Sequence, residues 1–133
     1  REESQDLMNY YESLPKESYR QAFLQVMDYQ ALYFERKGTE FVANFYSIML
    51  LSKNSLYDYG EFSLLSIVYD CFAKGQEQGE FTREFSAGYM CELALGLLYT
   101  ITTYWCMYPG RVDLTREIRS RMENLLEMLR PAR

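Results

Sequence analysis

The sequence predicts an all-α protein built as a bundle of five or six helices. Apolar residues recur at three- and four-residue steps along most of the chain, which is the spacing of helices with one buried face. Glycine or proline follows several of these segments, where helices commonly end, and no segment shows the pattern of a strand. With 133 residues, the chain is long enough to form one domain with its own core.

The composition excludes several classes of function. The net charge is −5, which suits nucleic-acid binding poorly, because that affinity depends on Lys and Arg neutralising phosphates. The chain has no His, which excludes His-ligated metal or haem and the Ser-His and Cys-His catalytic pairs. Cys71, Cys91 and Cys106 lie in apolar segments without CxxC spacing, so we expect reduced core thiols in the cytoplasm. We expect no enzymatic activity and no cofactor.

The first two helices are expected at residues 2–12 and 15–37. The first has only a thin apolar stripe. In the second, Pro15 suits the first turn, because the backbone N–H that proline lacks would have no partner there. Gly38 can adopt the left-handed conformation that ends a helix.

Two further helices are expected after Gly38. Thr39 can cap a helix that continues to about residue 53 and has so little polar surface that it must be covered on more than one side. Residues 54–60 are expected to form a loop. The next helix is predicted at residues 61–78, where a polar last turn precedes Gly79.

The segment at residues 82–108 predicts the longest and most apolar helix. Thr82 is its expected N-cap, and Pro109-Gly110 is expected to stop it. After Phe85 its only charged residue is Glu92. A helix that is apolar on all sides requires cover on all sides.

The last helix is expected at residues 113–129, with Asp113 as its N-cap. Pairs of opposite charges four residues apart are expected on its outside. Its apolar residues form a seam of about two heptads, which suits a bundle rather than a free coiled coil. The seam consists of Leu114, Ile118, Met122, Leu125 and Leu129.

Three kinds of contact could cover the long helix. A bilayer is disfavoured, because Glu92 lies well inside the segment and the flanks are not rich in Lys or Arg. Packing within the chain alone is the second possibility. We favour a homodimer, in which the last two helices of each copy form a four-helix bundle across a twofold axis. The expected interface residues are Gly96, Leu97, Ile101, Tyr104 and Trp105, with Leu114, Ile118, Met122, Leu125 and Leu129 at the flank.

Several motifs resemble the C-terminal regulatory domain of TetR-family transcriptional regulators. They are FAKGQEQGEF at residues 72–81, the long apolar helix ending in Tyr104-Trp105, the VDL sequence at residues 112–114 and the closing ENLLEML. The order of helices from residue 15 onward is also similar. The resemblance therefore covers most of the chain.

This resemblance implies a two-part protein. A basic helix-turn-helix domain, absent from this chain, would precede Arg1 and bind an operator as a dimer. The domain present here would dimerise through its last two helices and bind a small lipophilic or aromatic effector. Effector binding would allosterically control DNA binding by a regulator that is expected to be a repressor. A free-standing all-α interaction module with no ligand is the alternative.

The resemblance also implies a ligand pocket among the helices before the last one. The many Tyr and Met residues suit a cavity for an organic ligand, although each taken singly is more often part of an ordinary core. Glu92 either faces the pocket and binds a cation or donor on the ligand, or pairs with an Arg or Tyr at the domain edge. The other candidates are Phe23, Met27, Phe45, Tyr46, Met49, Tyr69, Phe72 and Tyr89. The long helix would thus serve the pocket with its first half and the partner subunit with its second half.

Overall fold

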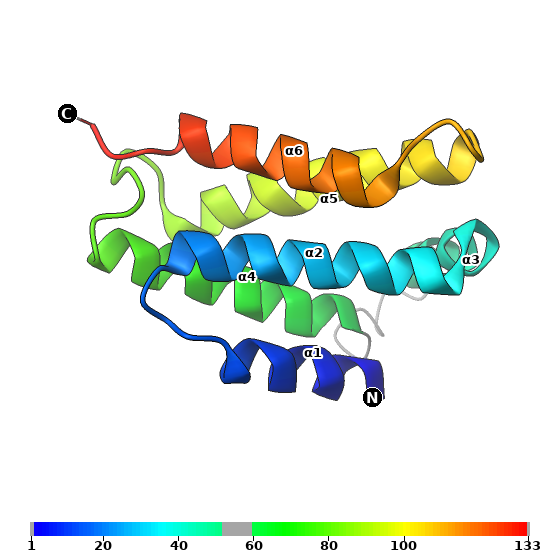
Figure 1. Cartoon of the computed structure of the whole chain (residues 1–133), viewed down its shortest axis with the longest axis horizontal. Helices are drawn as coiled ribbons and strands as arrows, with labels where there is room; N and C mark the ends of the chain where they lie inside the picture. The colour runs from blue at the N-terminus through cyan, green and yellow to red at the C-terminus, as the bar shows by residue number, and fades with distance from the viewer. Residues whose placement is uncertain (1, 52–59, 133) are drawn as a thin grey trace.

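The computed structural model describes residues 2–51 and 60–132, and every regular element within these ranges is an α-helix (Figure 1). This confirms the predicted all-α bundle. Residues 52–59, which include the predicted end of the third helix and most of the predicted loop, lie outside the described residues. The helices are α1 (Glu2–Ser13), α2 (Tyr19–Lys37), α3 (Thr39–Leu51), α4 (Gly60–Glu77), α5 (Ala87–Met107) and α6 (Leu114–Met128).

Helix α2 lies at the centre of the bundle (Figure 1). It packs against α6 along one side and against α4 along another, and α1 lies against α4. Helix α5 packs against α4 and α6, while α3 contacts α2 and α5 at the end of the bundle opposite the chain's C-terminus. The chain therefore forms one compact core that all six helices share.

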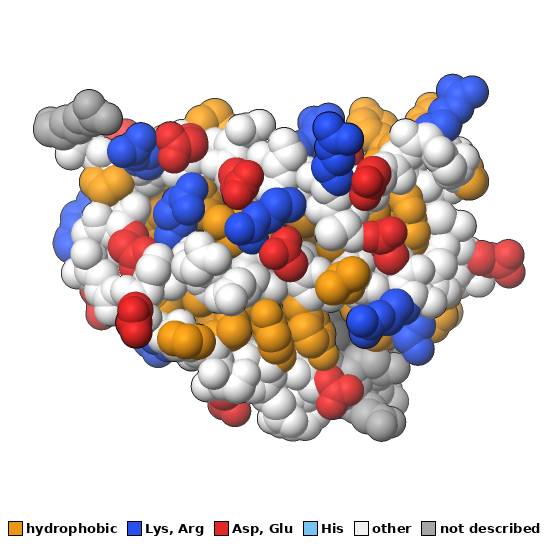
Figure 2. Space-filling view, in the orientation of Figure 1, with side chains coloured by type: hydrophobic (Ala, Val, Ile, Leu, Met, Phe, Trp, Pro, Cys, Tyr) orange, Lys and Arg blue, Asp and Glu red, His pale blue; other side chains and the backbone are white. Residues whose placement is uncertain are grey.

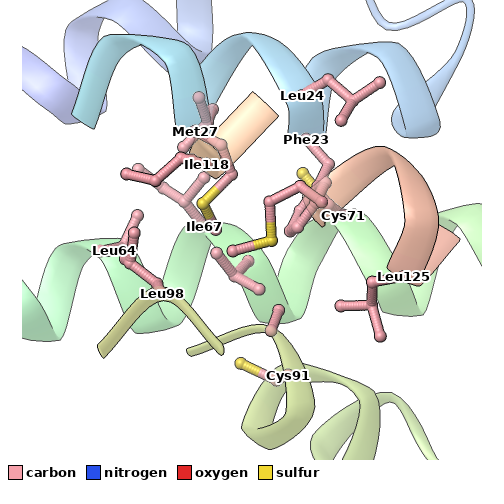
Figure 3. Packing of buried hydrophobic residues seen from close by; sticks show 14 of the residues in the cluster. Phe23, Leu24, Met27, Leu64, Ile67, Cys71, Cys91, Leu98, Ile118 and Leu125 are labelled. Atoms are coloured by element: carbon pink, nitrogen blue, oxygen red, sulfur yellow. The ribbon is translucent and has the colours of Figure 1, made fainter. Parts of the chain in front are cut away.

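Side chains from four helices meet at the centre of this core (Figure 3). The ring centroids of Phe23 and Phe72 are 5.2 Å apart, and those of Phe72 and Phe81 are 5.0 Å apart. These three rings are buried, and side chains of this size remove a large apolar area from water. The same cluster contains Leu24, Met27, Leu64, Ile67, Cys71, Cys91, Leu98, Ile118 and Leu125 (Figure 3).

Helix α2 begins later than the sequence predicts. It starts at Tyr19 rather than Pro15, because Ser18 has extended backbone angles and its hydroxyl accepts a hydrogen bond from the N–H of Gln21. The cap formed by the Ser18 side chain outweighs the preference of Pro15 for the first turn of a helix. At the other end, Gly38 stops the helix with a φ of 93°, as predicted.

The start of α5 also differs from the prediction, whereas that of α6 agrees with it. Helix α5 begins at Ala87, because its N-cap is Ser86 rather than Thr82. Asp113 caps α6 as predicted, and its carboxylate accepts a hydrogen bond from the N–H of Arg116 at 3.2 Å.

The segment between α4 and α5 joins the ends of several helices. The side-chain amide of Gln76, in the last turn of α4, donates to the carbonyl oxygens of Thr82 (2.9 Å) and Phe85 (2.6 Å). The backbone N–H of Thr82 donates to the carbonyl oxygen of Leu129, at the end of α6 (2.8 Å). Thr82 is therefore held in the connection, which explains why it does not cap α5.

Glu80 of the same segment caps α2. Its carboxylate accepts hydrogen bonds from the hydroxyl of Ser18 (2.8 Å) and from the backbone N–H groups of Tyr19 (2.9 Å) and Arg20 (3.1 Å). The first N–H groups of a helix have no partner within the helix. The carboxylate supplies that partner and places negative charge where the helix dipole favours it.

Two glycines explain the rest of the FAKGQEQGEF motif. A Cβ atom at Gly75 would lie 2.3 Å from the ring of Phe81, so only glycine lets this ring pack against α4. Gly79 turns the chain after α4 with a φ of 79°. The motif and the following Thr82 thus form the helix-end junction, which we define as Gln76, Glu80, Phe81 and Thr82.

The face formed by α2 and α6 is mixed in charge (Figure 2). Arg119 of α6 pairs with Asp28 of α2 at 3.0 Å and with Glu123 at 3.2 Å, and Arg121 pairs with Glu117 at 3.1 Å. The two pairs within α6 confirm the predicted i,i+4 pattern. Because these side chains are partly exposed, each pair contributes only about 0–1 kcal/mol to stability.

We expect Glu80→Ala to lower the free energy of unfolding by ~1–2 kcal/mol, because it leaves the first N–H groups of α2 without their acceptor. Urea denaturation followed by circular dichroism measures this change. Glu84→Ala is the matched control, since Glu84 is exposed in the same connection and its carboxylate forms no ion pair in the described part of the chain. Equal effects of the two substitutions would contradict the capping role of Glu80.

Candidate functional site

Helix α5 has one buried side and one open side. Its inner side is covered by α3, α4 and α6. The sequence predicts a helix that needs cover on all sides, and the chain supplies that cover on the inner side only. None of the helices in the described ranges is long and apolar enough to cross a membrane. The inner side consists of Ala87, Met90, Cys91, Ala94, Leu98, Ile101, Thr102 and Trp105.

The open side contains a continuous row of residues at three- and four-residue steps. Tyr89 and Met107 are large and apolar, and their side chains are 48% and 58% exposed. Tyr104, at the edge of the row, is 53% exposed. Glu92 is the row's only charged residue. We define the outer face of α5 as Tyr89, Glu92, Gly96, Thr100, Thr103 and Met107.

Aromatic residues extend the outer face at its N-terminal end. Phe85 packs against Tyr89 with ring centroids 5.6 Å apart, and Phe85 is itself 39% exposed. Leu65 of α4 lies next to α5, because its carbonyl oxygen accepts a hydrogen bond from the thiol of Cys91 at 3.7 Å. Tyr69, one turn further along α4, is 50% exposed. An exposed apolar surface of this kind is typical of a site that binds another molecule.

Gly96 lies in the middle of the outer face. A Cβ atom added there would meet no atom within 4 Å, so no contact in this chain requires glycine. Glycine inside a helix nevertheless costs about 0.5–1 kcal/mol relative to alanine. The position is therefore open to close approach by a second molecule.

The structure separates the residues predicted for the dimer interface into two groups. Gly96 and Tyr104 are exposed on α5 and Leu97 is partly buried, whereas Ile101 and Trp105 are on the inner side. The seam of α6 is also buried within the chain, where α6 packs against α2 and α5. Its side chains are buried within the single chain: Leu114, Ile118 and Met122 are 0% exposed, Leu125 is 6% exposed and Leu129 is 2% exposed.

The residues predicted to bind a ligand do not all lie together. Tyr69, Tyr89 and Glu92 are exposed on α4 and α5. The helices that carry them pack through their other sides. The remaining candidates lie in the core or against it, namely Phe23, Met27, Phe45, Tyr46, Met49 and Phe72.

Aromatic rings gather where α2, α3 and α5 meet. Tyr46 packs edge to face against Phe34 (6.1 Å between centroids) and against Tyr99 (5.1 Å). Thr102 follows Tyr99 by one turn of α5 and is fully buried, and its hydroxyl oxygen has no hydrogen-bond partner in the described part of the chain. A buried hydroxyl without a partner costs about 1–3 kcal/mol, so this position offers a polar group to a ligand.

The buried ionisable groups form hydrogen bonds within the chain. The hydroxyl of Tyr11 donates a hydrogen bond to the Asp70 carboxylate at 2.6 Å. Burial is the main cause that raises the pKa of Tyr11, and this hydrogen bond raises it further. Burial raises the pKa of Cys71 to about 12 and that of Cys91 to about 11, so both thiols stay protonated and unreactive near neutral pH. In the described ranges no group of His, Cys, Asp and Glu side chains could hold a metal ion.

Sequence reasoning missed three residues of the outer face, namely Thr100, Thr103 and Met107. The signal that contains them is the spacing of residues 89, 92, 96, 100, 103 and 107, which forms a second row on the side of α5 opposite the core. Large apolar residues in both rows predict a helix with contacts on two sides. The sequence alone does not say which row faces the chain's own core.

We expect Met122→Ala to lower the free energy of unfolding by ~2–4 kcal/mol, because it removes a fully buried side chain from the seam of α6. Tyr104→Ala should change it by less than about 1 kcal/mol at a protein concentration low enough to favour the monomer. Urea denaturation of both variants tests the distinction. A small effect at Met122 would contradict the burial of the seam within the chain.

Comparison of the chain with models of known protein families, with curated proteins and with solved structures found no match. The function is therefore inferred from the arrangement of residues on and beneath α5.

Proposed function

We propose that the chain is the effector-sensing and homodimerisation domain of a TetR-like transcriptional regulator that acts as a repressor. The observation that carries this proposal is the outer face of α5, an exposed and almost uncharged helix surface on a chain whose α2 and α6 face is densely charged. DNA would be bound by a separate helix-turn-helix domain. The acidic net charge of −5 agrees with a domain that does not contact DNA itself.

The composition of the outer face favours another copy of the chain as its occupant. Tyrosine and methionine are enriched in the centre of protein interfaces, where charged residues are depleted. Tyr89, Tyr104 and Met107 provide such side chains, and Glu92 is the only charge among them. Gly96 allows two helices to approach closely at the centre of the face.

The aromatic residues between α2, α3 and α5 are the proposed effector site. Phe34, Tyr46 and Tyr99 would contact a lipophilic or aromatic molecule, and Thr102 would form its hydrogen bond. Because a ligand there would have to separate these packed rings, it would act on the conformation in which α3 and α5 are further apart. Ligands shift a protein towards the conformation that they bind more tightly.

Helix α5 would couple the two sites, because its inner side touches the proposed effector site and its outer face would touch the partner. A ligand that changes the position of α5 against α3 changes the dimer geometry, and by linkage the dimer geometry changes ligand affinity equally. The sequence alone assigns the effector to the first half of this helix and the partner to its second half. The proposal instead assigns the effector to its inner side and the partner to its outer face.

A free-standing interaction module is the second candidate, because its only requirement is the same exposed face. It would bind a partner through α5 without any ligand in the core. The two candidates differ in whether a small molecule stabilises the chain.

We expect the chain to be a dimer in size-exclusion chromatography with light scattering at micromolar concentration. Gly96→Ala should weaken this dimer while stabilising the isolated helix by ~0.5–1 kcal/mol, because a methyl group helps α5 but obstructs close approach. Gly88→Ala is the matched control, since it lies in the same helix but not on the outer face. A monomeric chain, or equal dimer strength in both variants, would contradict the proposed interface.

We expect lipophilic aromatic compounds to include molecules that raise the melting temperature, because a ligand bound only to the folded state stabilises it by mass action. Thr102→Val should stabilise the ligand-free chain by ~1 kcal/mol, since it removes a buried hydroxyl without a partner. The same variant should lose most of the ligand-induced shift, whereas Ser120→Val, an exposed site on α6, should keep it. If no compound in a broad screen shifts the melting temperature, the interaction module becomes the better explanation.

A further inference from the structure

We propose that α1 is a strap over α4, which opens reversibly at residues 14–18 while the helices from α2 to α6 stay folded. Tyr11 is the latch of this strap, and Cys71 is the thiol that the strap covers. In the described part of the chain α1 contacts neither α3 nor α5. Opening of the strap therefore requires neither the proposed dimer nor the proposed effector.

Helix α1 lies at one edge of the bundle and packs only against α2 and α4 among the described helices (Figure 1). Of its described side chains, which are those of residues 5–13, only Leu7 and Tyr11 are buried. No backbone hydrogen bond joins α1 to another helix within the described ranges. An element with so few buried contacts belongs to the parts of a fold that open first.

The polar contacts between α1 and α4 converge on the hydroxyl of Tyr11. This hydroxyl donates to the Asp70 carboxylate at 2.6 Å and accepts a hydrogen bond from the thiol of Cys71 at 3.7 Å. The other oxygen of the Asp70 carboxylate pairs with Lys74 at 3.2 Å. The carboxylate therefore keeps a partner within α4 when α1 leaves, whereas α1 loses its polar contacts with α4 together.

The connection at residues 14–18 is suited to act as the hinge. Lys16 donates to the carbonyl oxygens of Tyr11 and Leu14, at 2.5 Å and 2.8 Å. These hydrogen bonds stay within the connection and the last turn of α1, so they do not hold the helix on α4. At the other end of the connection, the hydroxyl of Ser18 donates to Glu80 at 2.8 Å. The start of α2 thus stays in place while α1 moves.

Opening of the strap changes the chemistry of Cys71. Burial raises the pKa of this thiol to about 12, so it is unreactive near neutral pH while α1 covers it. The hydroxyl of Tyr11 lies against the sulfur, and the departure of α1 uncovers this side of the thiol. Cys91 is also buried, but its thiol donates to the carbonyl oxygen of Leu65, and α5 does not contact α1 in the described residues. Cys71 therefore reports the opening of the strap, and Cys91 reports unfolding of the rest.

Alkylation of the whole chain with iodoacetamide in native buffer tests the strap, with peptide mass spectrometry to follow each cysteine. We expect Cys71 to react about tenfold faster than Cys91 or more, because opening a short edge helix costs less than unfolding the core. Tyr11→Phe should raise the ratio of the two rates about tenfold, since it removes a hydrogen bond to a carboxylate and keeps the buried ring. Tyr10→Phe is the matched control and should leave the ratio unchanged. The Tyr10 ring stacks on Tyr29 at 4.5 Å, and its hydroxyl has no hydrogen bond in the described part of the chain.

Equal rates at Cys71 and Cys91, or no reaction at either thiol, overturn the strap, because Cys71 would then be uncovered only when the whole chain unfolds. Equal effects of Tyr11→Phe and Tyr10→Phe overturn the role of Tyr11 as its latch. Amide hydrogen exchange measured by mass spectrometry gives an independent readout. Peptides from α1 should exchange before those from α2 and α4, and Tyr11→Phe should accelerate exchange in α1 alone. Simultaneous exchange of all three helices contradicts the proposal.

Discussion

The carboxylate of Glu80 caps the start of α2, the helix at the centre of the bundle. This side chain lies in the connection after α4, yet it accepts hydrogen bonds from the first residues of α2, about sixty positions earlier in the sequence. A helix end that would otherwise need water is satisfied by another part of the chain. Because α1, α3, α4 and α6 all pack against α2, the contact between Glu80 and the start of α2 links the connection after α4 to the helix that these four share.

The sequence predicted the helices well because their boundaries depend on local chemistry. Asp113 and Gly38 act through their own side-chain and backbone properties, and they end or begin helices where expected. Pro15 and Thr82 misled the prediction, because Ser18 is the cap actually used and Thr82 is held by Leu129, which is distant in sequence. A tertiary hydrogen bond of that kind leaves no trace in the local pattern.

The candidate site was predicted less well, because tyrosine fits both a core and a surface. Tyr46 is almost fully buried between two rings, whereas Tyr89 is half exposed, and the sequence around each is equally apolar. The seam of α6 raised a similar difficulty, since the same spacing serves a helix of the same chain or of a partner. Only the position of α2 shows that the seam is already covered.

The hydrogen bond from Thr82 to Leu129 has a mechanical consequence for α5 and α6. It ties the segment just before α5 to the end of α6, at the same end of the bundle where Glu80 caps α2. Sliding of the two antiparallel helices along each other would break this hydrogen bond. A rotation of α5 that keeps this hydrogen bond moves the helix least near Ser86 and most near Met107, the end closest to α3.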